Sequence, residues 1–243
     1  MINDENYSLA LLQKEYDARQ MMRDIVSEVT ARYTPVGGSV LELGSGLGHN
    51  LDALIANYRV LGVEILPDAA QKASERGIET IQANLECEIN LRAENWDAVL
   101  CLDVLEHLAN PLNCIKEARR LLRSSGIFII NVPNHFTLAC RIRMLLGAGM
   151  DAPKFFPEYH AWDYPHLRFF QYQSIKKAAE LGGFTIAEDL SWRVPAVPFL
   201  QKIPGLKGFC YFLAKCSPNL FGGGFLLVLR KANSPNPSGE QLY

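Results

Sequence analysis

Short apolar runs alternate with amphipathic segments along the first part of this chain. The runs lie at 39–43, 59–64, 78–83, 96–102 and 126–132. Uninterrupted apolar runs are typical of strands that are buried on both faces of a parallel sheet. The segments between them predict helices over 47–57, over 67–75 and after Asn110. This order predicts an α/β fold with an open parallel sheet.

The residues after Asn110 carry the signals of a helix with defined ends. Asn110 can cap the first free N–H groups, and Pro111 occupies a position where a missing N–H costs little. Three basic residues suit the negative C-terminal end of this helix, namely Arg119, Arg120 and Arg123. Gly126 then begins the next predicted strand.

Both ends of the chain depart from this alternation. An apolar stripe from Ser8 to about Tyr33 predicts a helix. Beyond Asn134 the sequence is rich in proline, aromatic residues and histidine, and a helix at 173–181 and a strand at 184–190 follow. A second irregular, mostly apolar segment covers 192–221, and a last strand is predicted at 225–231.

These boundaries predict one central domain with additions. The length of 243 residues and the hydrophobic content of 49% are sufficient for a sizeable core. We expect a helical cap over 1–36, a domain over 37–232 with insertions at about 135–170 and 192–222, and a disordered tail over 233–243.

Composition and charge limit the classes of protein to which this chain can belong. The net charge of −2 and the pI near 6.2 provide no general attraction to nucleic acid, so nucleic acid is not an expected partner. Six cysteines occur without a CxxC pair, which fits a reducing compartment. The N-terminus lacks a secretion signal, and no stretch approaches the ~20 apolar residues of a membrane span. We therefore expect a soluble, cytoplasmic protein.

The stretch ELGSGLGHN, after the first predicted strand, is a candidate nucleotide-binding turn. Its glycines at 44, 46 and 48 allow a ligand to approach the backbone closely. The dinucleotide fingerprint would place its third glycine at position 49, where this chain has His49. Glu64 ends the second predicted strand, where a carboxylate can accept hydrogen bonds from both hydroxyls of a ribose. These features predict a ligand that contains a nucleoside, without identifying the rest of it.

Five motifs in order resemble those of the class I S-adenosylmethionine-dependent methyltransferases. They are ELGSGLG, GVEILPDAA, QANLE, WDAVLCLDVLEHLANP and LLRSSGIFIINVPN. The resemblance is strong over residues 38–135 and moderate over 166–190. Within that superfamily the chain looks closest to the methionine-biosynthesis W family and the ubiquinone-biosynthesis O-methyltransferases. This implies a Rossmann-like, seven-stranded, mostly parallel sheet with helices on both faces, together with a helical and aromatic lid.

The same resemblance implies which residues contact the cofactor, S-adenosylmethionine. Those around its methionine part would be Glu42 and the backbone at Gly44, Ser45 and Gly46, and Gly48 would be a further cofactor-binding residue. Those around its ribose, adenine and sulfonium would be Glu64, Ile65, Asn84, Leu85 and Leu102. Asn84 replaces the aspartate that is usual in the family, and its amide oxygen can still accept from the adenine amino group.

Methyl transfer from a sulfonium is an in-line displacement. Catalysis can therefore depend on positioning and on the removal of a proton from the acceptor. Candidate catalytic groups follow the fourth and fifth predicted strands, and they are Asp103, His107, His135 and His166. A histidine suits a general base at neutral pH because its unperturbed pKa is ~6.5. His160, in the same irregular segment as His166, is a further histidine to consider.

The D-x-x-E-H motif also suggests a divalent-metal site. Asp103, Glu106 and His107 would share one face of a short helix, and His166 would be a further ligand. The motif is similar to the E-x-x-E-H metal site of the small-RNA 2′-O-methyltransferases, and a similar motif occurs in the ubiquinone-pathway enzymes. The alternative is that Glu106 or His107 only supports the loop over the cofactor.

Aromatic residues beyond the fifth strand predict a lid over the cofactor. They are Phe155, Phe156, Tyr159, Trp162, Tyr164 and Phe169. Apolar walls suit a small or lipophilic acceptor, although the same residues could instead pack the core of the lid itself. The stretch 199–215 could also form an amphipathic element, edged by lysines, that contacts a membrane surface; these are Lys202, Lys207 and Lys215.

Together these patterns predict an S-adenosylmethionine-dependent methyltransferase that acts on oxygen of a small or lipophilic acceptor. One alternative is a cofactor-binding partner protein that modulates another enzyme, as the resemblance to the methionine-biosynthesis W family permits. Another is an NAD-dependent oxidoreductase, which His49 and the LEHLANP segment disfavour.

Overall fold

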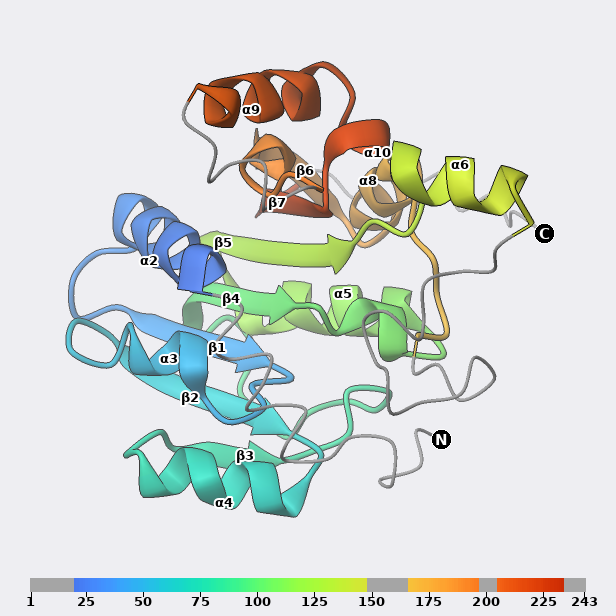
Figure 1. The fold of residues 1–243 in the computed structure, drawn as a ribbon. Helices are drawn as coiled ribbons and strands as arrows, with labels where there is room; N and C mark the ends of the chain where they lie inside the picture. The colour runs from blue at the N-terminus through green and yellow to red at the C-terminus, as the bar shows by residue number, and fades with distance from the viewer. Residues whose placement is uncertain (1–19, 148–165, 197–204, 234–243) are drawn as a thin grey trace.

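A seven-stranded sheet forms the centre of the computed structural model, which describes residues 20–147, 166–196 and 205–233 (Figure 1). The strands are β1 (Ser39–Leu43), β2 (Arg59–Glu64), β3 (Thr80–Gln82), β4 (Trp96–Leu102), β5 (Leu122–Pro133), β6 (Phe184–Asp189) and β7 (Gly224–Lys231). Their order across the sheet is β3-β2-β1-β4-β5-β7-β6. Only β7 is antiparallel, to both of its neighbours. The expected seven-stranded, mostly parallel α/β fold is therefore confirmed.

Helices cover both faces of this sheet. The α-helices are α2 (Gln20–Tyr33), α3 (His49–Asp52), α4 (Pro67–Glu75), α5 (Pro111–Leu121), α6 (Leu138–Leu145), α8 (Tyr172–Leu181), α9 (Leu206–Cys216) and α10 (Pro218–Phe221). The described residues also form two short 3-10 helices, η2 (Leu105–His107) and η4 (Ser191–Arg193). α2, α3 and α4 pack into one hydrophobic cluster, and α5 and α8 pack into the other, on the opposite face of the sheet.

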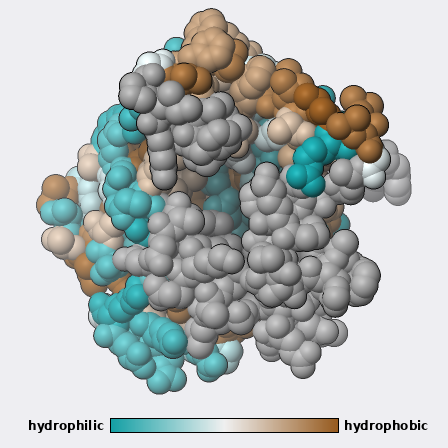
Figure 2. Space-filling view, in the orientation of Figure 1, coloured by the Kyte–Doolittle hydropathy of each residue, from teal (hydrophilic) through white to brown (hydrophobic). Residues whose placement is uncertain are grey.

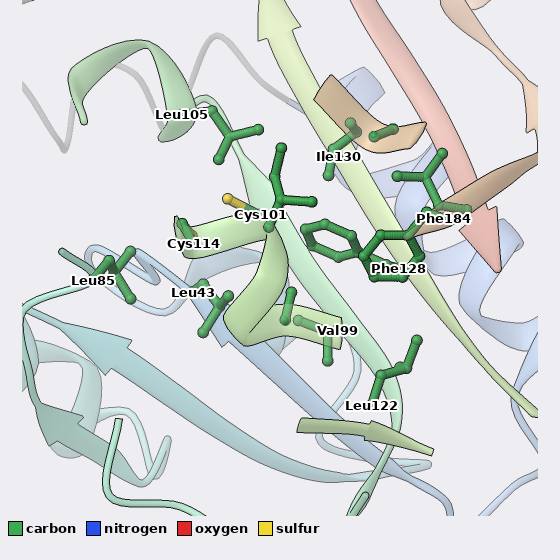
Figure 3. Packing of buried hydrophobic residues seen from close by; sticks show 14 of the residues in the cluster. Leu43, Leu85, Val99, Cys101, Leu105, Cys114, Leu122, Phe128, Ile130 and Phe184 are labelled. Atoms are coloured by element: carbon green, nitrogen blue, oxygen red, sulfur yellow. The ribbon is translucent and has the colours of Figure 1, made fainter. Parts of the chain in front are cut away.

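Successive residues of each central strand contribute to different clusters. In β5, Ile127 and Ile129 belong to the cluster on the α2 face, whereas Phe128 and Ile130 belong to the cluster on the α5 face. Figure 3 shows Phe128 beside Phe184 of β6 within that second cluster. Burial on both faces explains why these strands read as uninterrupted apolar runs.

Two of the predicted elements are shorter than expected. Instead of a helix over 47–57, α3 covers only His49–Asp52. The N–H groups of Leu54 and Asn57 then donate to carbonyls three residues earlier, so the chain continues as tight turns before β2. The strand predicted at 78–83 is limited to β3 at the edge of the sheet.

The ends of α5 agree with the prediction except at the N-terminal cap. The Asn110 side chain makes no capping hydrogen bond; instead, the Glu86 carboxylate accepts from the N–H groups of Ala109 and Asn110. Arg119 and Arg120 donate to backbone carbonyls outside the helix. Pro111 lies in the first turn and Arg119 and Arg120 in the last turn, as predicted; only the side-chain cap of Asn110 is missing.

β5 begins at Leu122, four residues before the predicted start at Gly126. Its pairing with β4 passes over residues 123–126, which form a bulge. Arg123 lies in this bulge, and its guanidinium pairs with Asp97 rather than with the end of α5.

The segments predicted as irregular contain helices. α6 begins after Thr137, whose hydroxyl accepts a hydrogen bond from the Cys140 N–H at 3.3 Å. In the second segment the described residues form α9 and α10. The amphipathic element predicted over 199–215 therefore includes most of α9.

Several predictions lie outside the described residues. They concern the helix over 8–19, His160, Lys202, the tail beyond 233, and the lid aromatic residues except Phe169. Within the described parts of the chain, no helix combines the length and the apolar character needed to cross a membrane.

Candidate functional site

The parallel strands place their carboxyl ends, and the loops that follow them, along one edge of the sheet (Figure 1). The glycine turn follows β1, Glu64 ends β2, and the D-x-x-E-H segment follows β4. In open α/β sheets this edge is where ligands bind. The predicted cofactor and catalytic residues are therefore brought to one side of the molecule by topology.

The glycine turn has a conformation and a packing that require glycine. Gly44, Gly46 and Gly48 have φ angles of +74°, +52° and +77°. A Cβ atom on Gly44 would lie 2.5 Å from a methyl carbon of Val104 in the loop after β4. The turn is therefore held against the loop that carries the candidate catalytic residues.

Glu64 holds the glycine turn through backbone hydrogen bonds. Its Oε2 accepts from the Gly46 N–H at 2.8 Å, and its Oε1 accepts from the N–H groups of Ile65 and Leu66 at 2.8 and 2.9 Å. The carboxylate is buried at the end of β2. Oε2 still has acceptor capacity for a ribose hydroxyl, whereas Oε1 already accepts two hydrogen bonds.

The methionine side of the predicted site contains buried polar groups. The Asn50 amide donates to Glu42 Oε1 at 2.6 Å. The Ser45 hydroxyl is buried and has no hydrogen-bond partner among the described residues. A buried polar atom of this kind is costly unless a ligand or water completes its hydrogen bonding, so the turn fits a polar ligand group.

A cation from α2 lies next to the same turn. Arg23 is buried and close enough to His49 for its charge to lower the pKa of that imidazole, together with the Arg76 charge. Burial is the largest cause, and the pKa of His49 falls to about 4. His49 is therefore neutral at pH 7. Sequence patterns did not single out Arg23, because one arginine in an amphipathic helix carries no distinguishing signal.

The predicted adenine side is more open. Ile65 is exposed and could present an apolar surface to a flat ring, while Leu85 is buried in the core. Asn84 is exposed, and its Oδ1 accepts from the Glu86 N–H at 2.9 Å. Leu102, at the end of β4, is buried in the cluster on the α2 face.

Asp103 begins the loop after β4 in an uncommon conformation. Its φ is +56°, in the left-handed region that residues with a Cβ rarely adopt. It precedes η2, so it is not on one helical face with Glu106 and His107 as the motif had suggested. Its carboxylate accepts a hydrogen bond from Asn131 of β5 at 2.7 Å.

Glu106, His107 and His166 form the group predicted as metal ligands, without Asp103. One ligand atom from each lies within 4.8 Å of the others, and it is the metal-candidate group found in the described part of the chain. Glu106 is 1% exposed, and its Oε1 lies 3.9 Å from His107 Nε2. Oxygen and imidazole donors of this kind suit a divalent transition metal.

Backbone hydrogen bonds bring His166 to this group. The N–H groups of Leu167 and Arg168 donate to the Glu106 carbonyl at 2.8 and 2.9 Å. The described segment that begins at His166 is thereby fixed to η2. The His107 and His166 rings meet edge to face at 4.6 Å between centroids. The side chain of Arg168 adds a hydrogen bond to the Ala109 carbonyl.

His135 extends the cluster from the end of β5. His166 Nδ1 and His135 Nε2 are 2.8 Å apart, and the Phe169 ring packs against the His135 ring. Burial lowers the pKa of His135 to about 4, although a hydrogen bond with the Pro133 backbone opposes this shift. His135 is therefore neutral at pH 7, and it can act only as a neutral donor or acceptor.

Two asparagines support this region and were not predicted from the sequence. Asn131 binds Asp103, and Asn134 donates to the carbonyls of Pro218, Asn219 and Gly222 at 3.2, 3.0 and 2.8 Å. Both are buried at the end of β5. The polar residues that interrupt the apolar run IFIINVPN were the available signal.

Comparison with known proteins agrees with this geometry. A family model described as a methyltransferase domain matches residues 14–189. The ubiquinone biosynthesis O-methyltransferase of Actinobacillus pleuropneumoniae is 28% identical over 123 residues, which cover 46% of this chain and 52% of that protein. The chain therefore spans about half the length of the curated relatives it matches.

Solved structures resemble the chain over most of its length. A chain of the complex between the Haloferax volcanii Trm112 methyltransferase activator and a methyltransferase has a TM-score of 0.64 at 17% identity, covering 96% of this chain and 99% of that chain. The [4+2]-cyclase SpnF has a TM-score of 0.58 at 17% identity, covering 87% and 80%. Because a cyclase shares the fold, the reaction must be argued from the residues of the site.

Proposed function

This chain belongs to the methyltransferase-domain family, and on that basis we propose that it transfers the methyl group of S-adenosylmethionine to an oxygen atom of a small or lipophilic acceptor. Oxygen is proposed as the acceptor atom because a cluster of titratable side chains lies beside the glycine turn. These are Glu106, His107, His166 and His135. A hydroxyl must lose its proton to become a good nucleophile, and imidazoles and carboxylates are the groups that accept one.

The residues around the glycine turn fit the cofactor. Glu64 would hold the ribose hydroxyls, the Ser45 hydroxyl would bind the methionine part, and the Arg23 guanidinium would face its carboxylate. When bound, S-adenosylmethionine supplies an electrophilic methyl group on a sulfonium. The positive φ angles of Gly44 and Gly46 shape the turn that would lie against this ligand.

We assign the proton acceptor to His166. A neutral His135 that is protonated on the nitrogen next to the Pro133 carbonyl would accept through Nε2 from His166 Nδ1–H, at the observed 2.8 Å. This tautomer leaves Nε2 of His166 unprotonated and able to accept the acceptor's proton. The nearby Glu106 carboxylate would stabilise the imidazolium that forms.

The same residues support a second arrangement. Glu106, His107 and His166 offer one carboxylate and two imidazoles within 4.8 Å, a donor set that suits a divalent metal ion. Such an ion would lower the pKa of an acceptor hydroxyl that binds it. In that case His166 would be a ligand and not the base.

The Actinobacillus pleuropneumoniae relative is named a ubiquinone biosynthesis O-methyltransferase, which supports a lipophilic acceptor for this chain. An acceptor of this kind would be met at a membrane surface. The alternative is a cofactor-binding partner protein that modulates another enzyme. Such a partner protein would have the same cofactor site as the proposed methyltransferase, but it would need no proton acceptor.

Calorimetry with S-adenosylmethionine and NAD, followed by transfer of labelled methyl to matched acceptors, tests the proposal. The acceptors are pairs with one carbon skeleton, such as an alkylphenol and the corresponding alkylaniline. We expect binding of S-adenosylmethionine, and methylation of the hydroxyl at least about tenfold faster than that of the amine. Equal rates would contradict O-methylation, and binding without transfer to any acceptor would favour the partner protein.

A further inference from the structure

Helix α6 has an apolar face that the described protein does not cover. None of its eight residues is buried. Leu138, Ile142, Leu145 and Leu146 lie at positions i, i+4, i+7 and i+8, which is one stripe of the helix. Leu145 and Leu146 are 87% and 81% exposed. Such a row of exposed leucines differs from scattered single apolar residues, which are common on surfaces.

Helix α9 presents a second apolar face at the same end of the molecule. Cys210 and Ala214 are buried on its inner side, whereas Phe209 and Phe212 are 56% and 61% exposed on its outer side. α10 contacts both α9 and α6, so the three helices form one layer. Figure 2 shows apolar surface from the top of the molecule, over α9, to the upper right, over α6.

Within the described residues, the segments that form these two faces carry only positive side-chain charges. Residues 134–147 and 205–223 contain Arg141, Arg143, Lys207 and Lys215 and no aspartate or glutamate. The whole chain has 24 lysines and arginines against 26 acids, so the remainder has 20 cations against 26 acids. By its position on the helical wheel, each arginine of α6 flanks the leucine stripe. Long basic side chains beside an apolar stripe can reach anionic headgroups while the apolar residues enter the lipid.

We infer that α6 and α9 together form a docking face for a bilayer that contains anionic lipid. The apolar side chains of both helices would insert into the bilayer, and the four cations would bind the anionic headgroups. Sequence patterns had suggested only the stretch 199–215, so the participation of α6 is decided by the structure. This inference does not depend on the proposed function, because it concerns binding without cofactor or acceptor.

The docking face is connected to the candidate site. Asn134 precedes His135, and its amide holds three carbonyls of the α10 segment. Through α10 the same contacts position α6 and α9. The docking face is therefore adjacent to the segment that carries His135.

Vesicle co-sedimentation of the full chain tests this face. The vesicles are phosphatidylcholine alone, or phosphatidylcholine with 30% phosphatidylglycerol, and no cofactor is added. We expect binding to the anionic vesicles only. Leu145→Asp with Leu146→Asp, and Phe209→Asp with Phe212→Asp, should each lower the vesicle partition coefficient at least about tenfold. Arg141→Gln with Arg143→Gln should weaken binding and reduce its salt dependence.

Matched control variants test whether the loss of vesicle binding is specific to the docking face. Val36→Asp changes another highly exposed apolar residue, and Lys72→Gln with Arg59→Gln removes two exposed charges elsewhere. These controls should bind as the unmodified chain does. Circular dichroism melts identify variants that fail to fold; for these the leucine pair is replaced by serine, and the same loss of binding is expected.

Three outcomes would overturn the inference. The first is no binding of the unmodified chain to anionic vesicles, and the second is unchanged binding of both aspartate pairs. The third is a dimer by light scattering that the same substitutions dissociate while vesicle binding stays absent. That third result would assign the face to a second copy of the chain.

Discussion

Asn131 Nδ2 donates a hydrogen bond of 2.7 Å to Asp103 Oδ1, from the end of β5 to the end of β4. In return, the Asp103 backbone N–H donates to the Asn131 carbonyl at 2.9 Å. These two bonds hold Asp103 at a φ of +56°, a conformation that costs on the order of 1 kcal/mol for a residue with a Cβ. The pair therefore fixes the start of the loop that carries Glu106 and His107.

Substitution of Asp103 separates its structural role from a chemical one. Asp103→Asn keeps a short side chain that tolerates the left-handed region and an oxygen for Asn131, so the unfolding free energy should change by less than about 0.5 kcal/mol. Asp103→Ala loses that acceptor and should cost about 1–3 kcal/mol, measured by urea unfolding. If the carboxylate takes part in catalysis, Asp103→Asn should lower turnover at least about tenfold. Turnover like that of the unmodified chain would remove Asp103 from the candidate catalytic groups.

His166→Gln and His135→Gln test the proton acceptor. If His166 removes the acceptor's proton, His166→Gln should lower kcat about 10²–10⁴-fold, with cofactor affinity within about twofold by calorimetry. His135→Gln should have a smaller effect, because His135 acts through His166. Phe169→Leu is the control, since it alters packing on His135 without a titrating group. Parallel loss of cofactor affinity in His166→Gln would show a structural role instead.

Metal removal tests the second arrangement of the same residues. Protein treated with EDTA and dialysed should lose methyl transfer if Glu106, His107 and His166 hold a divalent ion, and added Mg²⁺, Mn²⁺ or Zn²⁺ should restore it. Glu106→Gln should raise the metal concentration needed for half-maximal activity. Undiminished turnover in EDTA would exclude the metal arrangement and leave His166 as the base.

Glu64→Gln should lower both the affinity for the cofactor and the stability of the protein without cofactor. An amide has one acceptor oxygen, so it cannot accept both from Gly46 and from the Ile65 and Leu66 N–H groups. We expect a loss of about 1–3 kcal/mol in unfolding free energy and a 10–100-fold loss of S-adenosylmethionine affinity. Glu75→Gln, at an exposed position of α4, is the control for lost charge. Unchanged cofactor affinity in Glu64→Gln would place the ribose elsewhere.

His49 should make stability depend on pH in a predictable direction. Its pKa in the folded chain is about 4, below the ordinary histidine value of 6.5, so between these values the unfolded chain binds more protons. Stability from this group is therefore present above pH 6.5 and is lost as the pH falls toward 4. His49→Gln should thus gain stability relative to the unmodified chain between pH 7.5 and pH 5, by urea unfolding. Because His49 is partly exposed, the gain should be well below the full linkage value, and a difference that does not change with pH would contradict the assignment.

Local sequence was sufficient for the elements whose pattern is short-range. β1, β2 and β4 have the predicted bounds, because burial on both faces leaves an uninterrupted apolar run. The turn at Gly44 was recognised for a similar reason, since a positive φ and a close backbone approach each select glycine. At Asn110 and Arg123 the predicted interaction was wrong, because a tertiary contact replaces it. The Glu86 carboxylate accepts from the Asn110 N–H, and Arg123 pairs with Asp97 instead of the end of α5.

The sequence by itself determined the sheet, the glycine turn and the order of the motifs along its edge, because period and spacing are properties of neighbouring residues. Only the tertiary structure decided that His166 meets His107 and His135, since this depends on the Glu106 carbonyl that binds the backbone of a distant segment. It also decided that Asp103 pairs with Asn131 and that α6 leaves its leucines exposed. Contacts between residues far apart in the chain are set by packing of the whole fold, and no local pattern records them.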